Sequence, residues 1–227
     1  MNPTRILAAC ALLAGSCALS PVASASFIVD TGEATYSRAT AVYDSGESFQ
    51  SVAQRFTTTE TYDITSLAVF GHNGVSGATY SQNLLLSLAT GPDSPSNSDF
   101  TTLVSGLAML TTSGPFDNHW AVATLSPFRL YPGTYWLVVA IPPHEDPLPA
   151  VALPYNAPNP MDAFANNVSD LTEGWQIRSP YLTDLPEVRR AFGARIEGTV
   201  APVPLPGTFT LLLAGLGFMA VRRRLAA

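Results

Sequence analysis

The chain has 227 residues and a formal net charge of −6, with 17 Asp and Glu, 11 Arg and no Lys. Four arginines lie near the two ends, so the middle carries seven Arg against all 17 carboxylates, a formal charge of −10. Phosphate binding needs clustered Lys or Arg, so this composition argues against nucleic acid or anionic lipid as a partner and favours cations or neutral sugars.

The N-terminus has the three parts of a secretory signal peptide. A basic residue, Arg5, precedes the apolar run Ile6–Leu19, and small residues at Ala23 and Ala25 form an A-x-A site. This order predicts a helical signal peptide that signal peptidase removes after Ala25. A transmembrane helix and a lipoprotein signal ending at Cys17 are the alternatives.

The cysteines restrict the chemistry of the rest of the chain. Both of them, Cys10 and Cys17, fall inside the predicted signal peptide. A disulfide framework, a thiolate metal site and a Cys nucleophile are therefore excluded from the predicted mature part.

Residues 26–199 are predicted to form one β domain. Apolar and polar residues alternate, turn signals separate the runs, and no segment has a helical stripe. This pattern indicates a mainly β protein, an antiparallel jelly-roll-like β-sandwich, flanked by an N-terminal signal helix and a C-terminal hydrophobic helix. The predicted strands are Leu84–Ala89, Tyr135–Ile141 and Phe192–Glu197, with weaker ones at Ser51–Thr57, Ile64–Phe70, Trp120–Leu125 and Gln176–Arg178.

The stretch Pro142–Pro160 interrupts this rhythm with seven prolines. Proline cannot donate to a sheet ladder, so we predict a long surface loop and no central strand here. Such a loop serves either as a binding loop or as a spacer.

Histidine offers little support for catalysis. His72, His119 and His144 are expected in loops or at strand edges, and none belongs to a G-x-S-x-G or H-E-x-x-H motif. A Ser-His-Asp triad would have to be assembled in space. We therefore predict no catalytic residue and no enzyme activity.

Carboxylates and tryptophans provide the alternatives. Asp162, Asp170 and Glu173 lie near Trp175 and could serve a glycoside hydrolase. Trp136 is expected in the core, since both faces of its strand are apolar. Trp175 is predicted to be the most exposed tryptophan and a surface for sugar stacking, with burial in the core as the alternative.

A loop with three oxygen-bearing side chains is a candidate metal site. Asp93, Asn97 and Asp99 could offer ligands to Ca²⁺, but their spacing does not match an EF-hand loop. An Asx-rich turn is the alternative. We predict no cofactor and no metal, and we expect EDTA to leave the melting temperature unchanged.

The C-terminus has three parts in order. Residues 200–206 are a Pro-rich linker and box, and residues 207–227 are predicted to form a hydrophobic helix with a terminal Arg cluster. The run Thr208–Val221 would span about 21 Å as a helix, which is short of the roughly 30 Å hydrocarbon core. It therefore predicts a temporary anchor in the inner membrane, with the arginines on the cytoplasmic side.

This tail resembles the PEP-CTERM sorting signal of Gram-negative bacteria that make exopolysaccharide. The resemblance rests on Val203-Pro204-Leu205-Pro206, with Leu205 where that family usually has Glu, on the apolar run, and on Arg222, Arg223 and Arg224. It implies recognition by an exosortase, removal of the tail, and placement at the cell surface or in the extracellular matrix.

The middle of the chain resembles the choice-of-anchor domains of type R, which are extracellular β-sandwich modules. The resemblance rests on the order of four segments and implies a jelly-roll-like fold without an assigned activity. The segments are Ala53–Thr58, Tyr62–Leu67, Leu84–Ala89 and Pro132–Val139.

We therefore predict an exported, exosortase-sorted surface or matrix protein of a Gram-negative bacterium, with a structural or adhesive role. A carbohydrate-binding module for exopolysaccharide is the first alternative. A secreted hydrolase is the second.

Overall fold

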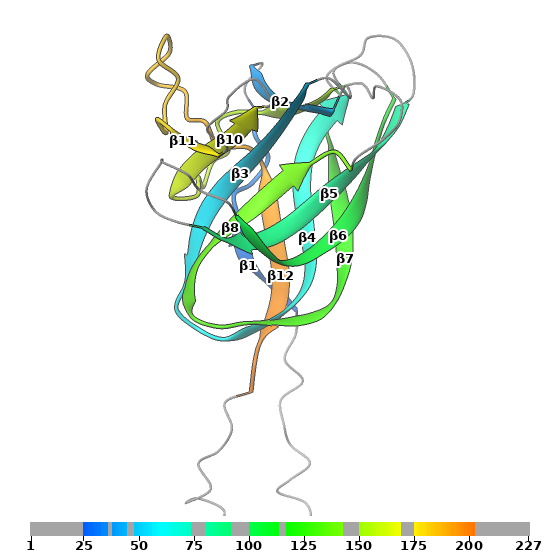
Figure 1. Cartoon of the computed structure of the whole chain (residues 1–227), viewed down its shortest axis with the longest axis vertical. Helices are drawn as coiled ribbons and strands as arrows, with labels where there is room; N and C mark the ends of the chain where they lie inside the picture. The colour runs from blue at the N-terminus through cyan, green and yellow to red at the C-terminus, as the bar shows by residue number, and fades with distance from the viewer. Residues whose placement is uncertain are drawn as a thin grey trace, which may run out of the picture.

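The structure, a computed structural model, describes residues 25–35, 38–44, 48–73, 80–91, 100–113, 117–142, 150–168 and 175–202. These residues form twelve β-strands and no helix, which confirms a mainly β protein (Figure 1). The strands are β1 (Ser26–Asp30), β2 (Ala39–Asp44), β3 (Phe49–Thr58), β4 (Tyr62–Asn73), β5 (Tyr80–Thr90), β6 (Thr101–Thr112), β7 (His119–Leu130), β8 (Gly133–Ala140), β9 (Val151–Pro154), β10 (Ala163–Val168), β11 (Gln176–Arg178) and β12 (Ala194–Val200).

All pairs between these strands are antiparallel, and they join into one sheet. Its order is β1-β12-β4-β9-β2-β3-β8-β5-β6, with β7 on β4, β10 on β3 and β11 on β10. In Figure 1 the part formed by β3, β8, β5 and β6 crosses in front of the part formed by β12, β4 and β7.

The main core lies between these two parts of the sheet. Alternate residues of a strand point to the same face, so Leu84, Leu86 and Leu88 of β5 enter it together. Leu67 of β4 and Ile196 of β12 belong to the same cluster, and all five side chains are fully buried.

Strand β8 is buried on both faces, which explains its unbroken apolar sequence. Leu137 and Val139 point into the main core, whereas Trp136 has 0% of its surface exposed on the other face. There its ring packs against Phe100, with ring centres 5.0 Å apart. The prediction that Trp136 lies in the core is confirmed.

The prediction for Pro142–Pro160 is wrong in part, because this stretch contains β9. Val151 and Leu153 are fully buried, and β9 is hydrogen-bonded to β2 on one side and β4 on the other. Residues 151–153 all carry an N–H and Pro154 is the last residue of the strand, so the prolines do not interrupt its ladder.

Four further strands, β1, β2, β6 and β10, were not predicted. In β6 the exposed face carries Leu107 and Met109, while Ala108 and Leu110 are buried. Because both faces are apolar, the alternation that reveals a half-buried strand is missing from the sequence.

Of the predicted signal peptide, residues 1–25, only Ala25 is described, and the predicted C-terminal helix, residues 207–227, lies outside the described residues. Among the residues that are described, no helix has the length and apolar character to cross a membrane.

Candidate functional site

The folded sheet holds the chain up to the start of the C-terminal tail. β12 ends at Val200, and the next residue, Ala201, is 4% exposed and donates its backbone N–H to the Thr61 carbonyl over 2.8 Å. Pro202 is exposed. The described part of the domain therefore ends two residues after its last strand.

The N-terminal end of the domain lies at the same place. β1 and β12 are antiparallel, with Ser26 opposite Gly198, and Ala25 is exposed just before β1. The predicted signal cleavage point therefore adjoins the point where the tail emerges. We call this end of the molecule the tail-exit end; in Figure 1 β12 runs down to it.

Two exposed side chains, one apolar and one aromatic, lie near the tail-exit end. Val200 is 48% exposed and lies opposite Tyr62 of β4, whose other neighbour is Leu130. Tyr131 follows Leu130 and is 62% exposed, and its carbonyl accepts a 2.8 Å hydrogen bond from the Tyr135 hydroxyl. Such residues suit the interface between a membrane and water.

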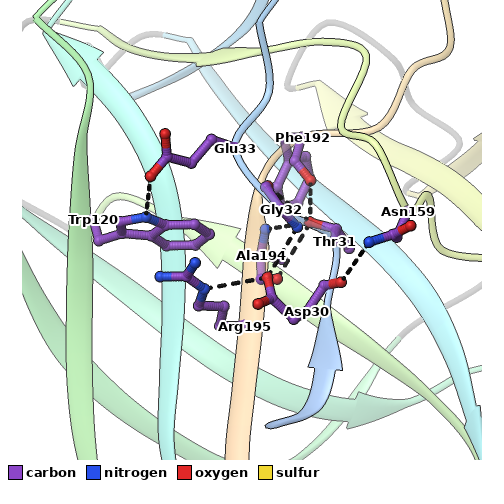
Figure 2. Close-up of polar contacts among 9 residues, drawn as sticks. All are labelled: Asp30, Thr31, Gly32, Glu33, Trp120, Asn159, Phe192, Ala194 and Arg195. Atoms are coloured by element: carbon purple, nitrogen blue, oxygen red, sulfur yellow. Dashed lines mark hydrogen bonds and ion pairs between the residues drawn. The ribbon is translucent and has the colours of Figure 1, made fainter.

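A buried threonine fastens the segment after β1 to β12 (Figure 2). The Thr31 side chain is 1% exposed, and its hydroxyl lies 3.2 Å from the carbonyl oxygens of both Phe192 and Ala194. The same oxygen accepts the Ala194 N–H over 2.7 Å. These contacts fix the first strand of the domain to its last.

Charged residues extend this junction toward the surface. The Arg195 Nε donates to Asp30 over 3.2 Å, and its guanidinium carbon lies 3.9 Å from the Trp120 ring centre. The Trp120 indole N–H donates to Glu33 over 3.3 Å, as Figure 2 shows. Arg195 therefore covers the Trp120 ring, which is the most exposed of the three tryptophans.

The prediction that Trp175 is the most exposed tryptophan is wrong. Only 9% of its surface is exposed, and its ring centre lies 4.5 Å from that of Phe100. It belongs to the same small cluster as Trp136, on the outer face of β8. Phe100, which directly precedes β6, occupies the surface that a sugar ring would need.

Two of the three histidines, His72 and His119, are among the described residues. His72 was expected at a loop or edge, but it is buried near the end of β4. His119 Nε2 lies 2.9 Å from an Asp117 carboxylate oxygen that also accepts hydrogen bonds from the Ser113 hydroxyl and N–H. The carboxylate stands between the serine and the imidazole, so the imidazole does not contact the hydroxyl it would have to activate.

Several other candidates fall outside the described residues. These are the Ca²⁺ candidates Asp93, Asn97 and Asp99, the carboxylates Asp170 and Glu173, His144, Ala23, and the tail residues Val203–Pro206 and Arg222–Arg224. Asp162 is described and exposed. Within the described part of the chain no group of three or more His, Cys, Asp or Glu is placed to hold a metal ion.

Two adjoining hollows of about 290 Å³ each were missed by the sequence analysis. They share Phe164 and Arg190, and their linings also include Arg178 and Arg189. The only sequence signal was the Arg189-Arg190 pair in a middle region with few basic residues.

Comparison with known protein families identifies the tail. Residues 202–224 match the PEP-CTERM protein-sorting motif, which confirms the predicted likeness of the tail to this sorting signal. No curated protein shows a significant match to the chain. The motif implies export, processing by an exosortase and a C-terminal membrane anchor before sorting.

Proposed function

We propose that this protein is exported, held at the outer side of the inner membrane by its tail, and then released by an exosortase to the cell surface or matrix. The observation that carries the proposal is the PEP-CTERM match, which begins at Pro202, directly after the folded β domain ends. At the cell surface or in the matrix, the protein has a structural or adhesive role without catalysis. We further propose that the antiparallel sheet belongs to a jelly-roll-like sandwich of the choice-of-anchor kind.

The short distance between fold and tail limits where the processing enzyme works. Ala201 is the last residue with a described hydrogen bond to the domain, and Pro206 follows five residues later. An extended chain covers at most about 3.6 Å per residue, so the box lies within about 18 Å of the sheet. An extended Pro box has no helical hydrogen bonds to hinder a peptidase, so cleavage falls in it or just after it.

Sugar stacking on Trp175 is not part of this proposal, because its ring is buried. The described residues also give no observation that favours a secreted hydrolase.

Intact-mass analysis of membrane and extracellular fractions tests the proposal. We expect the extracellular form to begin at Ser26 and to end near Pro206 or Gly207. Replacing Pro204 and Pro206 by Ala should leave an uncut, membrane-bound form.

Changing Arg222–Arg224 to Ala should weaken retention, whereas changing them to Lys, the matched control, should not, since both residues count equally in the positive-inside rule. An extracellular form that still ends at Ala227 would contradict the proposal.

A further inference from the structure

One of the two hollows is built almost entirely from hydrogen-bonding groups. It lies between β2, β3, β10 and β11 and has a volume of about 290 Å³. Its polar lining comes from Thr40, Gln50, Tyr155, Asn166, Arg178 and Arg190. We call it the arginine hollow. Its size is at the lower end of the range for small-molecule sites, which suits a ligand of about one sugar ring.

The charge of the arginine hollow is opposite to that of the domain. Two guanidinium groups line it, and no Asp or Glu does. Arg38, Arg129 and Arg195 each form an ion pair with an aspartate elsewhere. Arg178 and Arg190, by contrast, form no ion pair with any carboxylate among the described residues. A negative group that enters the hollow would lie against both guanidinium groups.

Both arginines are held in place by contacts that leave donors available. The Arg178 Nε donates to the Asn166 side-chain oxygen over 2.6 Å, which fixes one edge of the guanidinium. Arg190 is held through its backbone, whose N–H donates to the Pro180 carbonyl over 2.8 Å. The charge of Arg190 helps to lower the pKa of Asp184, but that carboxylate is hydrogen-bonded to Arg38, which is the main cause.

Neutral polar groups complete the lining. Gln50 Nε2 donates to the Thr40 hydroxyl over 3.1 Å and to the Ala41 carbonyl over 2.7 Å. The Tyr155 side chain is hydrogen-bonded to Thr40, and burial raises the pKa of its hydroxyl, which therefore stays neutral at pH 7. This network fixes hydroxyl and amide groups that can meet the hydroxyls of a ligand.

We propose that the arginine hollow binds a small hydroxylated carboxylate, namely a uronic acid residue of an acidic polysaccharide. Guanidinium groups match a carboxylate with paired, charge-assisted hydrogen bonds. The amide and hydroxyl groups of the lining meet the sugar hydroxyls. The net negative charge of the domain disfavours highly charged phosphates, whereas a single carboxylate is tolerated locally.

The position of the arginine hollow fits a protein that is tethered at its other end. Gln50 lies near the start of β3, and Thr58 at its end donates to the Tyr131 carbonyl beside the tail exit. Eight residues of strand at about 3.3 Å each separate the two by about 26 Å. In the anchored precursor the hollow would face away from the membrane, but the proposal itself does not depend on sorting.

Isothermal titration of the full-length protein, purified in a mild detergent, tests the proposal with three probes: D-galacturonate, D-glucose and inorganic phosphate. We expect galacturonate to bind at least about tenfold more tightly than either of the others, because only galacturonate satisfies both the guanidinium and the hydroxyl-binding groups. Arg190→Gln should weaken galacturonate binding about tenfold or more, and Arg190→Lys should weaken it less.

Arg129→Gln removes the same charge from an exposed pair outside the hollow and should leave binding unchanged. Melting curves without ligand show which variants fold. If Arg190→Gln does not fold, the binding measured with Arg190→Lys tests the role of Arg190. Four results would each overturn the proposal. Glucose or phosphate could bind as tightly as galacturonate, Arg190→Gln could bind galacturonate with unchanged affinity, or neither galacturonate nor its oligomers could bind.

Discussion

At the scale of single residues, buried hydroxyl groups are the most constrained features of this domain. Only 1% of Thr31 is exposed, so water cannot replace the hydrogen-bond partners of its hydroxyl group. Its oxygen accepts the Ala194 N–H, so the backbone of β12 depends on it for one hydrogen bond. A buried donor without an acceptor costs more free energy than the average hydrogen bond contributes.

Replacing Thr31 by Val removes the hydroxyl and keeps the shape. We expect Thr31→Val to lower the free energy of unfolding by about 1–3 kcal/mol, because the Ala194 N–H is left buried and unpaired. Thr31→Ser keeps the hydroxyl and loses one methyl group, so it should cost about 1 kcal/mol or less. Urea unfolding measures both, and an equal loss in the two variants would contradict the role of the hydroxyl.

The carboxylate of Asp117 gives a pH-dependent prediction. Hydrogen bonds from the Ser113 hydroxyl and then from His119 lower the pKa of Asp117 from 3.8 to about 2. The folded state therefore favours the ionised form, and this contribution to stability is present above pH 3.8 and lost as the pH falls toward 2. Carboxyl NMR should give a midpoint near 2 for Asp117, moving up toward 3.8 in Ser113→Ala. A midpoint that Ser113→Ala leaves unchanged would disprove the assignment.

At the scale of elements, the pairing of β12 with β4 is irregular where it approaches the tail. The register shifts between Glu197 and Gly198, opposite Ile64 of β4. A Cβ atom on Gly198 would lie 2.6 Å from the Asp63 carbonyl oxygen and 2.9 Å from the Ile28 Cδ1. Glycine is therefore required here by the close approach of a neighbouring backbone.

Gly198→Ala should push β12 away from β4. We expect a loss of about 1–3 kcal/mol in unfolding free energy, together with faster hydrogen exchange of the Ala201 N–H. Gly133→Ala is the matched control, since its nearest neighbour is the Tyr135 side chain at 3.1 Å, which can shift. Equal effects of the two substitutions on Ala201 exchange would argue against this account.

At the scale of the whole molecule, the domain has two distinct ends. The start of β1 and the end of β12 meet at the tail-exit end, where Tyr131 and Val200 are exposed. Leu107 is also exposed, but it lies far from that end. It pairs with Leu85 of β5, and Leu85 pairs with Ala140 of β8. Ala140 is the last residue of β8, whereas the first residue, Gly133, lies next to the tail-exit end. If the tail anchors the precursor, Tyr131 lies closer to the membrane than Leu107 does.

Single cysteines can report this difference, because the native cysteines, Cys10 and Cys17, lie in the predicted signal peptide. We expect Tyr131→Cys to react several-fold more slowly with a membrane-impermeant maleimide in the anchored precursor than in the tail-free form. Leu107→Cys, the matched control, should react equally in both. Equal protection at both positions would rule out an orientation set by the tail.

The sequence alone determined the class of the fold and the nature of the tail. Alternation in β12 reflects local geometry, because successive side chains of a strand point to opposite faces. The tail could be predicted because its box, apolar run and Arg222–Arg224 are contiguous in the chain. Signals of this kind need no knowledge of which distant segments meet.

Only the tertiary structure decided what depends on long-range packing. β9 became a central strand because β2 and β4 lie on both sides of it, and Trp175 was buried because Phe100 covers it. The arginine hollow joins Gln50 to Arg178 and Arg190, which are more than a hundred residues away in the chain. No local sequence pattern predicts these contacts, because they form only when the sheet brings its distant strands together.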